Sequence, residues 1–157
     1  MTAGPRRWPR HQHDERGQMG GLEAVAFGVL VLVLGMLGAA SAWAVVDTKV
    51  AAASAAREAA RAYVESDGSA GAWDEAVGRG REAFAGHGRN PAVLSLPQPV
   101  EGFGRCGPVT VTASTPVELP RIPGIRAVAR TVTVRASHTE VVDPYRSGLG
   151  RHGGACA

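Results

Sequence analysis

The chain has 157 residues, a formal net charge of +3, 5% aromatic residues, Gly 21 and Pro 10. This length allows one small domain beside a membrane segment, with few large apolar residues left to build a core outside the longest apolar run. The basic residues are scattered, which argues against a nucleic-acid surface. No nucleotide-binding, metalloprotease or serine-hydrolase motif occurs in a fitting context, so we expect neither an enzyme nor a cofactor.

Residues 1–21 are polar and contain prolines, and we expect a disordered cytoplasmic tail. The basic residues on the two sides of the apolar run are close to even in number, but the tail is short and has no helix partner, which favours keeping this end in the cytoplasm and the rest of the chain outside. We therefore expect a single-pass protein of the cell membrane with an extracytoplasmic head. The arginines of the tail are Arg6, Arg7, Arg10 and Arg16.

Residues 25–46 contain no charge, amide or proline and predict a transmembrane helix. A bilayer core is ~30 Å thick, which a helix crosses in ~20 residues. An alanine-rich stretch follows without glycine or proline until Gly68, so one helix is expected over residues 22–65. On this extension Ala52, Ala55, Ala59 and Tyr63 share one side of the helix.

A cleaved secretory signal is the alternative for this segment. Ala40-Ser41-Ala42 and Ala42-Trp43-Ala44 both offer small-x-small cleavage sites. The apolar run is longer than the ~7–15 residues of a signal's hydrophobic region, which favours retention.

The head is expected over residues 66–146, followed by a glycine-rich tail over 147–157. A second helix is predicted over 71–85, with Trp73, Val77 and Phe84 on one face, although Gly78 and Gly80 weaken it. Alternating apolar and polar residues predict strands over 109–114 and 131–135, joined by a proline-rich hairpin connection that starts near Pro116. Residues 93–96 add a short strand. The fold class is thus α+β, a long N-terminal transmembrane helix extending into a small head.

Two pairs of residues outside the long helix are of types that take part in catalysis, metal binding or disulfide formation. His138 and Glu140 lie two apart on one side of a strand without a third group, which favours solvated edge residues. Cys106 and Cys156 are the two cysteines, and outside the cytoplasm they are able to form a disulfide; two unpaired thiols are the alternative.

The apolar helix itself carries the candidate site. Glu23 stands at its start, where a carboxylate needs a partner or a shallow position and is favoured by the helix dipole if it lies in the first turn. Gly28, Gly35, Ala39 and Ala42 fall on one face, and such small residues allow close approach of another helix.

The segment from Arg16-Gly17 through Glu23 to the stretch Ala55-Ala56-Arg57-Glu58-Ala59-Ala60-Arg61 resembles the TadE-like pilus assembly proteins. These are pilin-like minor pilins or pseudopilins of the tight-adherence (Flp) type IVb machinery. The likeness covers roughly residues 15–65 well and the rest loosely. It implies a structural protein whose helix packs with other pilin-like subunits, in contact with the lipid bilayer and the pilus secretion machinery, including a prepilin peptidase.

The same resemblance implies that Glu23 pairs with the N-terminal amine of a neighbouring subunit. Cleavage between Gly17 and Gln18 would leave Glu23 sixth, one residue later than the family pattern, and cleavage after Gly20 would leave it third. The alternative function, of a different class, is a membrane-anchored or secreted extracytoplasmic binding domain unrelated to pili.

Overall fold

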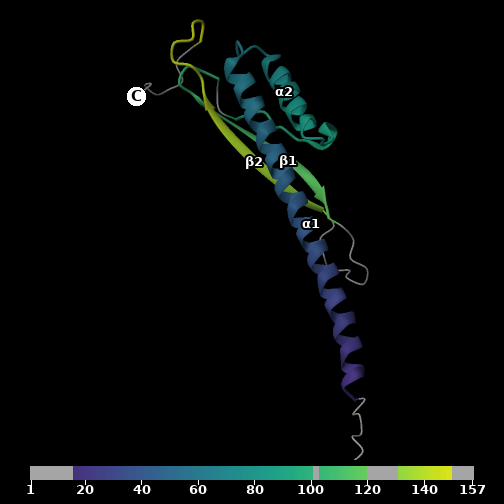
Figure 1. Ribbon diagram of the computed structural model, residues 1–157. Helices are drawn as coiled ribbons and strands as arrows, with labels where there is room; N and C mark the ends of the chain where they lie inside the picture. Colours follow the sequence, from purple (N-terminus) through teal and green to yellow (C-terminus); the bar gives the residue numbers. More distant parts are fainter. Residues whose placement is uncertain (1–15, 101–102, 120–130, 150–157) are drawn as a thin grey trace, which may run out of the picture. The chain divides into compact units, whose positions relative to one another are not determined.

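The computed structural model describes residues 16–100, 103–119 and 131–149; the side chains of residues 16–20 and 22 are outside this description. Its elements follow the order α1 (Arg16–Glu65), α2 (Ala72–Gly86), a short 3-10 helix η1 (Pro91–Val93), β1 (Pro108–Glu118) and β2 (Thr131–Val141). The protein is therefore α+β, with a long apolar N-terminal helix, a second helix and a two-stranded antiparallel sheet (Figure 1).

Helix α1 begins at Arg16, six residues before the predicted start at residue 22, so residues 16–21 are helical rather than part of a disordered tail. Each residue added to an existing helix gains a hydrogen bond without a new nucleation cost, which offsets the ~1 kcal/mol penalty of a glycine. The predicted end at Glu65 is confirmed. There the Ser66 hydroxyl donates to the Tyr63 carbonyl at 2.7 Å, and Gly68 follows with a φ of 71°.

Helix α2 confirms the second predicted helix to within one residue at each end. Trp73 and Phe84 are buried on its inner face, and Val77 is half-buried against the same core. Gly80 has a positive role that the sequence pattern did not suggest. A Cβ at this position would lie 3.0 Å from the Ala55 carbonyl oxygen and 3.1 Å from the Ala59 Cβ, so glycine allows α2 to approach α1 closely.

Strands β1 and β2 confirm the predicted hairpin and are longer than predicted. Their register pairs Pro108 with Val141 at one end and Glu118 with Thr131 at the other. Pro116 lies inside β1 and not in the connection, because an edge strand tolerates a missing N–H that faces away from its neighbour. The rest of the predicted connection, residues 120–130, lies outside the described residues.

The predicted strand over 93–96 is wrong. Pro91 favours a helical turn, which Asn90 caps by accepting a hydrogen bond from the Ala92 N–H at 3.0 Å. Only Ser95 pairs with the sheet, through two backbone hydrogen bonds of 2.9 Å to Ser114.

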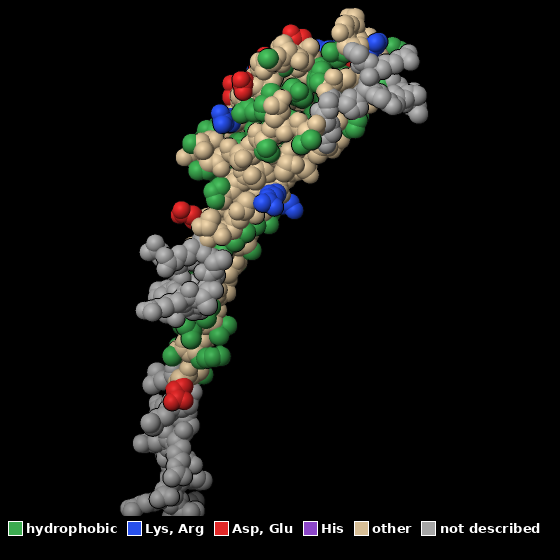
Figure 2. Space-filling view, turned by 180° about the vertical axis from the view of Figure 1, so that it is seen from behind, with side chains coloured by type: hydrophobic (Ala, Val, Ile, Leu, Met, Phe, Trp, Pro, Cys, Tyr) green, Lys and Arg blue, Asp and Glu red, His purple; other side chains and the backbone are tan. Residues whose placement is uncertain are grey.

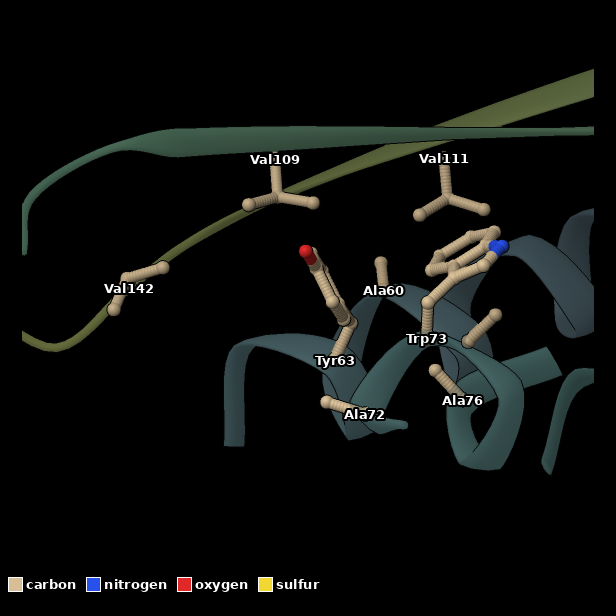
Figure 3. Packing of buried hydrophobic residues seen from close by; sticks show 9 residues of the cluster. Ala60, Tyr63, Ala72, Trp73, Ala76, Val109, Val111 and Val142 are labelled. Atoms are coloured by element: carbon tan, nitrogen blue, oxygen red, sulfur yellow. The ribbon is translucent and has the colours of Figure 1, made fainter. Parts of the chain in front are cut away.

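The core of the head joins the second part of α1, from Ala51 to its end, to α2 and β1. Its largest members are Tyr63, Trp73, Val109 and Val111, with Tyr63 and Trp73 in edge-to-face contact at 5.3 Å between ring centroids (Figure 3). A second cluster surrounds Phe84 and is formed largely by alanines of α1. These alanines are Ala51, Ala52, Ala55 and Ala56, all with 0% exposure.

The chain divides into two compact units, Met1–Ala39 and Ala40–Ala157. The alanine face of α1 supplies one wall of the core and lies in the second unit. The predicted boundary between residues 65 and 66 stays a prediction.

Candidate assembly helix

The first part of α1, up to Val50, exposes large apolar side chains. Val25, Phe27 and Met36 are between 64% and 68% exposed, and the hydrophobic side chains along this helix are visible in Figure 2. Among the described residues, one helix is long and apolar enough to cross a membrane, and none of its most apolar window is buried within the protein. Exposing apolar surface to water costs ~25 cal/mol per Å². A bilayer or another protein surface is the environment that would remove this cost.

The small residues on the predicted contact face of the helix, which we call the helix seam, have free space beside them. A Cβ added at Gly28 or Gly35 would meet no atom within 4 Å, and Ala39 and Ala42 are exposed. Nothing in the described chain occupies the space that these residues leave free. The arrangement is therefore compatible with a close helix neighbour from another molecule, although the seam itself remains a prediction.

Glu23 is exposed and makes no hydrogen bond or ion pair within the described part of the chain. Its place in α1 corrects one prediction. Because the helix begins at Arg16 and has no acidic residue in its first turn, Glu23 lies two turns inside and does not benefit from the N-terminal dipole. An apolar environment would therefore leave its carboxylate dependent on an outside partner.

The predicted processing site, Gly17 and Gln18, lies within α1 and not in a tail. The backbone there is helical, and cleavage at this bond stays a prediction. Cys106 is disulfide-bonded and adopts a φ of 62°, with its N–H donating to the Val142 carbonyl at 3.0 Å. The predicted partner, Cys156, lies outside the described residues.

Two long-range contacts that the sequence pattern did not indicate fix α1 in the head. Asp47 forms an ion pair with Arg89, which follows α2. At the other end, the Arg146 guanidinium donates to the carbonyls of Val64 and Glu65 at 2.7 and 2.5 Å. These carbonyls have no partner inside the helix, so a cation there caps its C-terminus. The partners are 42 and 81 or more residues apart, which explains why no local pattern revealed them.

Hydrogen bonds shift the pKa values of two charged groups at the C-terminal end of α1 and in the turn that follows it. A hydrogen bond to Glu65 and its negative charge raise the pKa of Arg61 above its ordinary value. The backbone N–H of Ser69, assisted by its hydroxyl, lowers the pKa of the Asp67 carboxyl. Within the described residues, no group of three or more His, Cys, Asp or Glu side chains is placed to hold a metal ion.

No protein-family model, curated protein or solved structure matches this chain.

Proposed function

We propose that the protein is a non-enzymatic, single-pass structural component of a TadE-like pilus assembly system. In this proposal the first part of α1 crosses the cell membrane, with the N-terminus in the cytoplasm and the head outside. The helix then packs with other pilin-like subunits in the membrane or in the pilus. The secretion machinery and its prepilin peptidase are the further partners.

The observation that supports this proposal most is the difference in burial between the two parts of α1. Its second part is built into a folded head through fully buried alanines, while its first part keeps Gly28 and Gly35 open and its large apolar side chains exposed. A helix of this kind has one end held by its own domain and one end available for lateral packing. The sequence resemblance over residues 15–65 is the second support.

Glu23 would act as a positioning group in this assembly. A carboxylate near the hydrocarbon is costly when unpaired, so a subunit that supplies a positive group at this depth is preferred over lipid. Gly28 and Gly35 would allow the two backbones to approach closely enough for that pairing. The same three residues thus give both affinity and register.

Glu23→Ala in the full-length protein, expressed in its own host, tests the proposal. We expect unchanged membrane insertion but roughly tenfold less protein in the pilus fraction, since a polar contact between membrane helices contributes ~1–2 kcal/mol. Glu75→Ala, which removes an exposed acid of α2, is the matched control and should leave incorporation unchanged. Equal incorporation of the wild-type protein and Glu23→Ala would contradict the assigned role of Glu23.

N-terminal sequencing of the mature protein separates the proposal from the extracytoplasmic binding domain. A start at Gln18 supports a processed pilin-like subunit. A start after Ala44 removes the apolar helix and favours a secreted domain. An uncleaved start together with absence from the pilus fraction favours an anchored domain with no role in pili.

A further inference from the structure

Strand β2 has an open edge. The sheet contains β1 and β2 alone among the described residues, and no described backbone group pairs with the outer side of β2. The strand is 11 residues long and rich in threonine and valine, with no proline or lysine. Such an edge presents unpaired N–H and C=O groups to which a strand of a second molecule can add. The natural candidate is a second copy of this chain, which is present wherever the protein is.

The helix-facing side of β2 changes from apolar residues near the start of the strand to polar residues near its end. Cross-strand partners share a face, so the register with buried residues of β1 identifies the inward positions. Toward the start of β2 these are apolar, with Val134 6% exposed opposite Thr115. Toward its end they are His138 opposite Val111 and Glu140 opposite Val109. The inward apolar positions are Val132, Val134 and Ala136.

His138 and Glu140 pair with each other in this inward position. Their Nε2 and Oε1 atoms are 2.8 Å apart, and the side chains are 32% and 39% exposed. Both therefore retain part of their hydration, and no third strand of the described residues covers them. Glu140 also acts on Arg61 of α1, where it contributes after Glu65 and Glu58 to the raised pKa of the guanidinium.

We propose that the His138–Glu140 pair prevents a second copy of this chain from adding a strand to the edge of β2. An added strand would cover the pair and remove its remaining water without supplying new partners. Taking the Glu140 carboxylate and its histidine partner out of water commonly costs more than their mutual attraction returns. An inward-pointing charge at a sheet edge therefore opposes pairing with another chain. This inference rests on the geometry of the sheet and holds whether or not the protein assembles into pili.

The test compares the full-length wild-type protein with H138V/E140V in detergent micelles over a range of protein concentrations. Amide hydrogen exchange across β2 and light scattering are the two measurements. For the wild type we expect exchange at the β2 edge to be independent of concentration. For H138V/E140V we expect larger species, with roughly tenfold slower exchange at the edge as concentration rises, the effect of about one added hydrogen bond per amide.

T131V/T133V is the matched control, because it adds the same two valines to exposed, outward positions of the same strand. We expect it to behave as the wild type. Equal association of control and test variants would overturn the proposal, because general strand hydrophobicity would then be the cause. The proposal would also be overturned if amide exchange at the wild-type β2 edge slowed as the protein concentration rose. A folded H138V/E140V that stays monomeric would overturn it as well.

Exchange at the buried amides of Val109 and Val111 checks that each variant is folded. If H138V/E140V does not fold, H138T/E140T removes the His138–Glu140 pair with a smaller change in polarity and volume. We expect H138T/E140T to associate as its concentration rises, whereas T131V/T133V stays monomeric. Monomeric behaviour of folded H138T/E140T at every concentration would again contradict the proposal.

Discussion

The two parts of α1 differ in a way that residue hydrophobicity alone would not suggest. Phe27, in the first part, is 68% exposed, whereas Ala55 and Ala59, in the second part, are 0% exposed. The side chain with the greater apolar area is therefore the one left open. Burial depends on whether α2 and β1 supply a complementary surface, and they supply it only to the alanine face. No described part of the chain covers the large exposed side chains of the first part.

A pair of phenylalanine truncations is the strongest way to test this difference. Phe84→Ala removes a side chain that is 1% exposed in the alanine-lined cluster, and we expect a loss of about 3–5 kcal/mol in the stability of the head. Phe27→Ala should change that stability by less than about 0.5 kcal/mol. Denaturant dependence of hydrogen exchange in β1, measured in detergent micelles, gives both values. Similar losses for the two variants would show that the first part of α1 contributes to the head.

Two glycines of α1 and α2 provide a second matched comparison. Gly80→Val places a branched side chain against the Ala55 carbonyl and Ala59, and we expect a loss of about 1–3 kcal/mol or more. A Cβ added at Gly28 meets no atom within 4 Å, so Gly28→Val should leave the head unchanged. The same unfolding measurement applies. A neutral Gly80→Val would mean that α2 can move away from α1 without cost.

A third comparison uses two threonines of β1, the buried Thr115 and the outward-facing Thr112. Its side chain is buried and its hydroxyl has no hydrogen-bond partner. Because an unsatisfied buried hydroxyl is costly, Thr115→Val should stabilise the head by about 1 kcal/mol. Thr112→Val, on the outward face of β1, should stay within about 0.5 kcal/mol of the wild type. A destabilised Thr115→Val would indicate that the hydroxyl is satisfied in solution.

The smallest effect concerns Asp67, in the turn that follows α1. The Ser69 N–H donates to its carboxylate at 2.9 Å and lowers its folded-state pKa. A lowered folded pKa contributes stability above the unfolded value, near 3.8, and this is lost as the pH falls through the folded value. Carboxyl chemical shifts followed by NMR should give a titration midpoint below that of an unfolded peptide. In Ser69→Ala the midpoint should stay lowered, since the backbone donor is the larger cause. A midpoint at the ordinary value would contradict the turn geometry.

The sequence by itself determined the elements whose signal is local. Alanine density and the absence of proline defined α1 up to Glu65, and alternation of valine with threonine defined the cores of β1 and β2. Trp73 and Phe84 were recognisable as the inner face of α2 because helical periodicity places them together. Each of these signals depends on residues that are close in sequence, within about three helical turns of each other.

Only the tertiary structure decided which surfaces meet. Gly80 read as a weak point of α2 until Ala55 and Ala59 were found against it, and Arg146 gave no sign that it caps α1. The start of α1 also escaped local rules, since glycines near Arg16 conceal the continuation of an existing helix. For Gly80 and Arg146 the physical reason is the same. Packing and capping depend on groups brought together across the chain, whereas propensity and periodicity report only on neighbours in sequence.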